Sequence, residues 1–201
     1  MNRFSAARLL ISAASPVQFP SDHGVEIAFA GRSNAGKSSA LNAVLGRRAL
    51  ARSGKTPGQT RLINFFEIGA DARVIDLPGY GYARVAEAER RRWAQSIERL
   101  RERAAFAGLF VIVDSRRGLS EADEALIDWA EPQLRSVHVL LSKADKLTRQ
   151  QAAACLSAAR SALGGRATAQ LFSATEGTGV GEARQVLTAW LAAGPRGDHR
   201  T

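Results

Sequence analysis

The chain of 201 residues has a single cysteine, Cys155, and lysines only at positions 37, 55, 143 and 146. One cysteine cannot form an internal disulfide, which excludes the disulfide-rich secreted folds. No apolar run approaches the ~20 residues that a membrane-spanning helix needs, so we expect no membrane partner. The three histidines are scattered without ligand spacing, and the sequence gives no reason to expect a zinc site.

Hydrophobic residues make up 45% of the chain and charged residues 23%, which is ordinary for one globular domain. Basic residues outnumber acidic ones by 28 to 19, and arginine carries the excess. Such an excess is typical of proteins that bind a polyanion such as nucleic acid. It is equally typical of a solvated, arginine-rich surface, so composition alone leaves both interpretations open.

Apolar runs alternate with helical patterns along the chain. We predict strands over 25–30, 62–67, 73–76, 109–114, 137–141 and 168–172. We predict helices over 38–45, 86–103, 121–131, 148–163 and around 183–191, with the three tryptophans on their core faces. This alternation predicts a three-layer α/β fold with a six-stranded, mostly parallel sheet. The short link 68–72 suits a hairpin, which would make one strand antiparallel.

A phosphate-binding loop follows the first predicted strand directly. The string GRSNAGKS at 31–38 fits G-x-x-x-x-G-K-S between a buried strand and a helix. Glycines let successive backbone amides point at a phosphate, and the helix N-terminus adds its positive end. We expect Lys37 to reach the β- and γ-phosphates and the Ser38 hydroxyl to bind Mg²⁺. The predicted phosphate-binding residues are Gly31, Arg32, Ser33, Asn34, Ala35, Gly36, Lys37 and Ser38.

A second loop, Asp76-Leu77-Pro78-Gly79, follows another predicted strand. The Asp76 carboxylate can hold Mg²⁺ through water, and the Gly79 amide can reach the γ-phosphate. Because ligands of open α/β sheets bind at the carboxyl ends of the strands, we expect this loop to lie beside the phosphate loop.

A third loop predicts the choice of base. In Ser142-Lys143-Ala144-Asp145, the Asp145 carboxylate can accept both N1–H and the exocyclic N2–H₂ of guanine. Adenine lacks that donor pair, so Asp145 would select GTP over ATP. The Lys143 stem can cover the base, and a backbone amide of Ser173-Ala174 can reach the guanine carbonyl.

With these motifs in place, the chain resembles the EngB family within the TrmE-Era-EngA-EngB-septin-like class of P-loop GTPases. The strings that carry the resemblance are GRSNAGKSS at 31–39, GKTPGQT at 54–60, LINFF at 62–66, DLPGYGYA at 76–83, SKADKL at 142–147 and FSA at 172–174. The resemblance implies a Ras-like G domain over 25–193, after an N-terminal segment (1–24) and before a flexible tail (194–201). It further implies a cytoplasmic GTPase that binds Mg²⁺ and acts in assembly of the large ribosomal subunit, and whose loss disturbs cell division and septation.

The resemblance also assigns roles to individual residues. It implies that Ser38 and Thr60 ligate Mg²⁺ and that Asn34, Lys37, Thr60 and Gly79 serve hydrolysis. Within the implied first switch, the residues that would close over the γ-phosphate are Gly58, Gln59, Thr60, Arg61 and Leu62. The implied second switch starts with Asp76, Leu77, Pro78 and Gly79. The implied guanine-binding residues are Ser142, Lys143, Ala144, Asp145, Phe172, Ser173 and Ala174. Ser142 departs from the usual Asn or Thr, and we expect weaker bracing of the phosphate loop with guanine selectivity retained.

Tyr80 stands where Ras-like proteins carry a glutamine that orients the attacking water, so we expect slow intrinsic hydrolysis. Asn34 matches GTPases in which this asparagine helps to coordinate K⁺, which predicts stimulation by K⁺. The alternative is that Asn34 only braces its own loop.

Arginines cluster near the predicted switches, and we expect a monomer whose basic surface contacts ribosomal RNA. These basic residues are Arg47, Arg48, Arg52, Lys55, Arg84, Arg90, Arg91, Arg92, Arg99, Arg101, Arg103, Arg116 and Arg117. A P-loop kinase of small molecules and a GTPase scaffold at the division machinery are the alternative functions.

Overall fold

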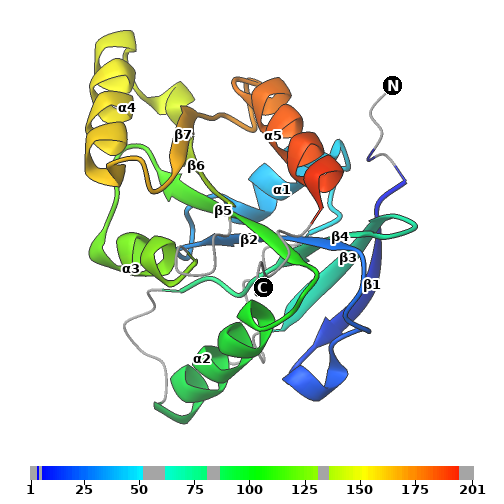
Figure 1. Cartoon of the computed structure of the whole chain (residues 1–201). Helices are drawn as coiled ribbons and strands as arrows, with labels where there is room; N and C mark the ends of the chain where they lie inside the picture. Colours follow the sequence, from blue (N-terminus) through cyan, green and yellow to red (C-terminus); the bar gives the residue numbers. More distant parts are fainter. Residues whose placement is uncertain (1–3, 5, 52–61, 81–86, 131–135, 195–201) are drawn as a thin grey trace.

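The strands predicted from the apolar runs join in one sheet between two layers of helices in a computed structural model of the chain (Figure 1). The structure describes residues 4, 6–51, 62–80, 87–130 and 136–194, except for the side chains of 87–90, 92 and 93. The strands are β1 (Arg8–Ala13), β2 (Val25–Gly31), β3 (Ile63–Gly69), β4 (Ala72–Asp76), β5 (Phe106–Asp114), β6 (Ser136–Ser142) and β7 (Thr168–Leu171). The helices are α1 (Lys37–Leu45), α2 (Glu87–Arg101), α3 (Glu121–Ala130), α4 (Arg149–Leu163) and α5 (Val180–Ala193), with short 3₁₀ turns η1 (Pro16–Gln18) and η3 (Ala144–Lys146).

The sheet has the strand order β1-β3-β4-β2-β5-β6-β7. Strands β4, β2, β5, β6 and β7 are parallel, and β3 forms the predicted antiparallel hairpin with β4. Because β1 is antiparallel to β3, it runs in the same direction as the others. The prediction of a mostly parallel α/β sheet with one reversed strand is confirmed for the described residues.

The prediction of six strands was wrong, because β1 adds a seventh at the edge of the sheet. This strand pairs with one neighbour only, so its sequence lacks the continuous apolar run of a strand buried on both faces. Leu9 and Leu10 are exposed, and Arg8 forms an ion pair with Glu67 of β3. The leading segment therefore packs on the domain as a part of its sheet.

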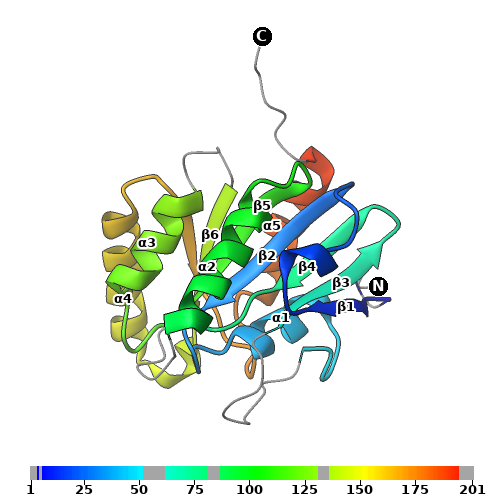
Figure 2. The same ribbon diagram turned by 90° about the horizontal axis from the view of Figure 1, so that it is seen from below.

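Two apolar clusters cover the two faces of the sheet. Helices α1 and α5 pack on one face, and α2, α3 and α4 pack on the other (Figures 1 and 2). Side chains of β2 alternate between the clusters, with Phe29 toward α1 and α5 and Ala28 toward α2 and α3. Trp129 and Trp190 each pack a helix against a strand, next to Phe106 and Phe110 respectively. The side chain of Trp93 lies outside the described residues.

Parallel strands bring their carboxyl ends to the same edge of the sheet. The phosphate loop, the Asp76–Tyr80 segment and the turns after β5, β6 and β7 all leave from this carboxyl edge. The amino ends of the same strands lie at the opposite edge, the amino edge. Both names refer to the ends of the strands and not to the outermost strands β1 and β7. No helix among the described residues is long and apolar enough to cross a bilayer.

Candidate functional site

The phosphate loop has a backbone that only a few residue types can adopt. Asn34 and Gly36 have φ angles of 65° and 99°, in the left-handed region that glycine and, less readily, asparagine occupy. A Cβ on Gly31 would lie 2.7 Å from the Ile112 carbonyl oxygen, so glycine is needed where β2 approaches β5. Helix α1 begins at Lys37 with Gly36 as its N-cap. The loop thus has the curvature and the helix start of an anion-binding nest.

Lys37 and Asp76 lie together at the centre of the carboxyl edge. The Lys37 ammonium donates to the carboxylate of Asp76, the last residue of β4, which is 5% exposed. The Asn64 amide lies 3.4 Å from the other Asp76 oxygen, and its carbonyl accepts from the Ser12 hydroxyl at 2.7 Å. Sequence reasoning missed Ser12 and Asn64, which connect Asp76 to the edge strand β1.

The segment after Asp76 pairs with the phosphate loop. The Ser33 amide donates to the Tyr80 carbonyl at 3.0 Å, and Arg32 and Tyr80 form an isolated parallel bridge. Gly79 packs so closely that an added Cβ would lie 3.1 Å from Ser33 Oγ. The Tyr80 side chain extends to α3 instead, where its hydroxyl donates to Asp123 Oδ1 at 2.6 Å. Tyr80 therefore joins the phosphate loop to helix α3.

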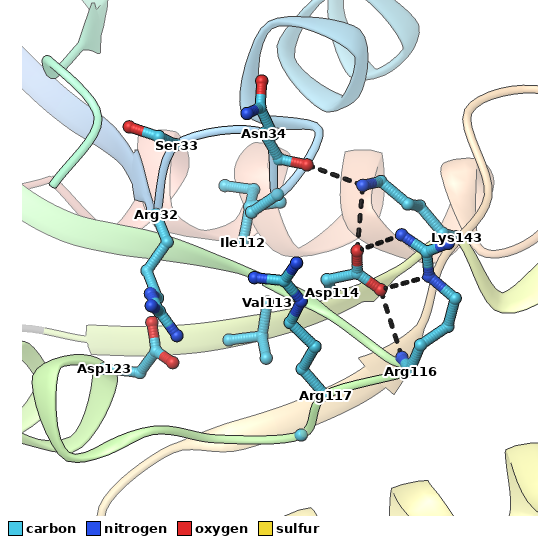
Figure 3. Close-up of a pocket in the computed structure, with 12 residues that line it drawn as sticks. Arg32, Ser33, Asn34, Ile112, Val113, Asp114, Arg116, Arg117, Asp123 and Lys143 are labelled. Carbon is cyan, nitrogen blue, oxygen red and sulfur yellow. Dashed lines mark hydrogen bonds and ion pairs between the residues drawn. The ribbon is translucent and has the colours of Figure 1, made fainter. Parts of the chain in front are cut away.

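Ser142 and Lys143 hold the other side of the phosphate loop. The Ser142 hydroxyl donates to the Ala35 carbonyl and also lies 3.0 Å from the Val113 carbonyl. The Lys143 ammonium donates to the Asn34 carbonyl at 2.6 Å and pairs with Asp114 at 2.9 Å (Figure 3). The predicted contact of Ser142 with the loop backbone is present.

Asp114 is a site residue that sequence reasoning missed, although it ends strand β5 at the carboxyl edge. Its carboxylate accepts from Arg116 Nε at 2.9 Å and Nη2 at 2.7 Å, in addition to Lys143 (Figure 3). The Arg116 hydrogen bond, together with Lys143, holds the pKa of Asp114 well below its usual range. This cluster and the phosphate loop line a cavity of about 140 Å³.

Asp145 lies where η3 follows β6, and the loop after β7 orients its carboxylate. The Ser173 hydroxyl donates to Asp145 Oδ1 at 2.6 Å, and Lys146 pairs with the other oxygen at 3.1 Å. The Ser173 hydrogen bond, followed by that of Lys146, lowers the pKa of Asp145. The Ala144 amide donates to the Phe172 carbonyl at 3.1 Å, which joins the two loops. The structure thus brings the predicted residues 142–145 and 172–174 together.

Part of the predicted site lies outside the described residues. Gly58, Gln59, Thr60 and Arg61 fall there, and Leu62 is exposed just before β3. Ser38 is the second residue of α1 and is half-buried. The assignment of Thr60 as a metal ligand therefore stays a prediction.

Only some of the arginines predicted to form a basic surface are exposed and outside ion pairs within the α2 region. Arg116 and Arg117, directly after β5, are exposed at the carboxyl edge, and Arg47 and Arg48 are exposed beyond the C-terminal end of α1. Three arginines of the α2 region are engaged in ion pairs: Arg99 with Glu102, Arg101 with Glu98, and Arg103 with Glu26. Arg103 is buried at the amino edge, so placing it on the basic surface was wrong.

Comparisons with known proteins agree with this geometry. A family model described as a 50S ribosome-binding GTPase matches residues 26–143. A probable GTP-binding protein EngB of Azoarcus sp. strain BH72 is 48% identical over 196 residues, which cover 95% of this chain and 94% of that protein. One of Coxiella burnetii is 45% identical and covers 96% of both. A crystal structure of a probable GTP-binding protein EngB has a TM-score of 0.68 and 22% identity, and the match covers 84% of this chain and all of that one.

Proposed function

The chain belongs to the EngB family of GTP-binding proteins and is a P-loop GTPase, and from this premise we propose that it is a slow, Mg²⁺-dependent GTP switch that acts in assembly of the large ribosomal subunit. The observation that carries the switch assignment is the meeting of the phosphate loop, Asp76 and Asp145 at one edge of the sheet. Each of the three supplies one part of GTP recognition.

Guanine selection is assigned to Asp145. Because its pKa is lowered, the side chain is a carboxylate that can accept both donors of the guanine edge. Ser173 fixes its orientation, and the Ser173 amide is engaged by the Thr178 carbonyl. We therefore assign the contact with the guanine carbonyl to the Ala174 amide. An adenine in the same place would leave the carboxylate without its two partners.

The triphosphate and the metal are assigned to the phosphate loop and Asp76. The Lys37 ammonium pairs with Asp76 in this structure, and when nucleotide binds it would exchange this partner for phosphate oxygens. Ser38 and Asp76 supply oxygen donors, which Mg²⁺ prefers, so the residues present fit the metal. Bound Mg²⁺ would neutralise charge that develops on the phosphates. Thr60 would complete the metal site from the first switch.

Slow hydrolysis follows from the place of Tyr80. Its hydroxyl is engaged by Asp123, and a phenol lacks the amide with which a glutamine orients water. We propose that K⁺ near Asn34 supplies additional positive charge. The left-handed backbone of Asn34 also explains an asparagine there without K⁺. Equal GTPase rates in potassium and sodium salts would exclude a role for K⁺, and an Asn34→Ala variant that keeps its stimulation by K⁺ would exclude a role for Asn34 in it.

The ribosomal role is supported by the description of the matching family model and by the exposed arginines at the carboxyl edge. Arg116 and Arg117 line the cavity beside the phosphate loop, so RNA phosphates bound there would be sensitive to the nucleotide state. Effects on cell division and septation would then follow from defective ribosome assembly.

Sedimentation with purified ribosomal subunits tests this role. We expect co-sedimentation with the large subunit in the presence of a non-hydrolysable GTP analogue and much less with GDP. The binding constant should fall with salt, with a log–log slope of roughly −0.7 for each single-stranded phosphate contact.

A matched pair of variants tests which arginines take part. Arg117→Ala should weaken binding to the subunit, whereas Arg160→Ala, at the far end of α4, should leave it unchanged. Binding that is independent of both salt and nucleotide would contradict the proposal.

A further inference from the structure

Asp123 is a buried side chain to which the proposed function assigns no part in nucleotide binding. It lies in the first turn of α3 and is 1% exposed. One oxygen accepts from the Tyr80 hydroxyl at 2.6 Å, and the other accepts from the Ser120 amide at 2.9 Å and the Ser120 hydroxyl at 2.6 Å. Figure 3 shows the Arg32 guanidinium beside it. Both oxygens of the Asp123 side chain are thus hydrogen-bonded at the N-terminal end of α3.

The bond to Tyr80 bears directly on the phosphate loop. The Tyr80 carbonyl accepts a hydrogen bond from the Ser33 amide, and the preceding Gly79 packs against Ser33. The side chain of the same residue is anchored on α3. Burial, followed by the charge of Asp123, raises the pKa of the Tyr80 phenol, which keeps the proton that it donates. The position of Gly79 is thus fixed between the phosphate loop and helix α3.

We propose that Asp123 is a positioning residue that, through the Tyr80 hydroxyl, holds the Gly79 amide in place for the γ-phosphate. The inference rests on the proposed role of Gly79 in GTP binding. Because Gly79 is assigned to the γ-phosphate alone, the effect of Asp123 is specific to the nucleotide that carries a γ-phosphate. GDP binding uses the phosphate loop and Asp145 and does not need Gly79.

The test uses Tyr80→Phe, which removes one hydroxyl, and Asp123→Asn, which keeps the shape of the side chain. We expect each variant to raise the ratio of the Kd for a GTP analogue to the Kd for GDP by about fivefold. This factor is smaller than the full loss of one hydrogen bond to a charged group, because only part of that loss reaches the Gly79 amide. The kcat for GTP should fall by a similar factor. The double variant should be no worse than Tyr80→Phe alone, because without the Tyr80 hydroxyl the change at Asp123 has no bond left to weaken.

Glu98→Gln is the matched control. Glu98 of α2 accepts from the Trp129 indole of α3 at 3.2 Å, so this bond also anchors α3 to a neighbouring element but does not touch the phosphate loop. We expect Glu98→Gln to leave the ratio of Kd values at the wild-type level. A purely structural role of Asp123 predicts instead that Asp123→Asn weakens both nucleotides equally, and an unchanged ratio would likewise overturn the proposal.

Gly79→Ala separates failure of the inference from failure of its premise. The added methyl would contact Ser33 and displace the Gly79 amide, so the variant should lose affinity for the GTP analogue more than for GDP. If Gly79→Ala raises the ratio and Tyr80→Phe does not, only the role of Asp123 is wrong. If neither changes the ratio, the assignment of Gly79 to the γ-phosphate is wrong.

Discussion

The two edges of the parallel sheet each carry a cluster of carboxylates and cations, and the clusters differ in what surrounds them. At the amino edge, Glu26 is fully buried and binds Arg73 at 2.9 Å and Arg103 at 2.6 Å. Both guanidinium groups also donate to the Ser21 carbonyl, and Arg73 contacts His23. This cluster is closed and its hydrogen bonds are internal.

At the carboxyl edge, the charged groups lie beside a loop with left-handed backbone and a cavity. The side chains of Lys143 and Arg116 are 31% and 49% exposed, against 9% for each arginine of the amino edge. Lys37 binds the Asp76 carboxylate and Lys143 binds the Asn34 carbonyl, and a bound nucleotide can replace these partners. Ion pairs alone therefore do not mark a binding site. An anion-binding backbone beside accessible charges does.

The largest effect is expected at the amino edge. Glu26→Gln leaves two buried guanidinium groups without their carboxylate, so we expect a loss of about 3–5 kcal/mol in the free energy of unfolding. The Kd for GDP, measured below the unfolding transition, should stay at the wild-type value. Urea unfolding and nucleotide titration measure the two quantities.

Glu102→Gln serves as the control for Glu26→Gln, because it breaks only the exposed pair with Arg99. We expect it to cost under about 1 kcal/mol. A stability of Glu26→Gln close to that of this control would show that the buried cluster is not the structural element described here.

The opposite pattern is expected for Asp145→Asn. The variant exchanges a charge-assisted acceptor for an amide, so its affinity for GDP should fall by about 10- to 100-fold while its stability changes little. Inosine diphosphate lacks the 2-amino donor, so Asp145→Asn should lose less affinity for inosine diphosphate than for GDP. Equal losses for the two nucleotides would argue against a bidentate contact at Asp145.

A smaller effect is expected for Ser142. Ser142→Ala removes the hydroxyl that donates to the Ala35 carbonyl, and we expect about a fivefold loss of affinity for GDP. Ser142→Thr keeps the hydroxyl and should bind GDP within about twofold of the wild type. If both variants bind GDP alike, the hydroxyl does not brace the loop.

The smallest effect concerns His138, which lies in β6 between the two edges. It is buried, hydrogen-bonds with Thr168 and Gln170, and its pKa is lowered by burial. In the unfolded chain, where a histidine has a pKa of about 6.5, His138 therefore takes up a proton at a higher pH than in the folded protein. Stability is therefore complete above that pH and falls as the pH drops toward the lower folded pKa. Urea unfolding between pH 7.5 and 5.5 should show this slope, and His138→Gln should reduce it.

Much of the fold follows from local patterns in the sequence. Strands β2, β5 and β6 were predicted because they are buried on both faces, and the phosphate loop because glycine, lysine and serine stand at fixed spacing between strand and helix. Strand β1 was not predicted, since an edge strand with exposed leucines has no such pattern.

The parts of the site that were missed depend on contacts between distant segments. Asp114 binds Lys143, Asn64 binds Ser12, and Asp123 binds Tyr80, each across 29 to 52 positions. Such pairings follow from the strand order, which a pattern along the chain does not contain. Arg103 was misplaced for the same reason, because its partner Glu26 lies 77 positions away.

The central claim is that the carboxyl edge is a site selective for guanine nucleotides, and competition for that site tests it most directly. GDP, inosine diphosphate and ADP would each displace a fluorescent GDP from the wild-type protein in Mg²⁺. We expect GDP to compete best, inosine diphosphate less well, and ADP at least about 100-fold more weakly than GDP. Displacement by ADP as effective as by GDP would contradict the claim and favour a P-loop kinase.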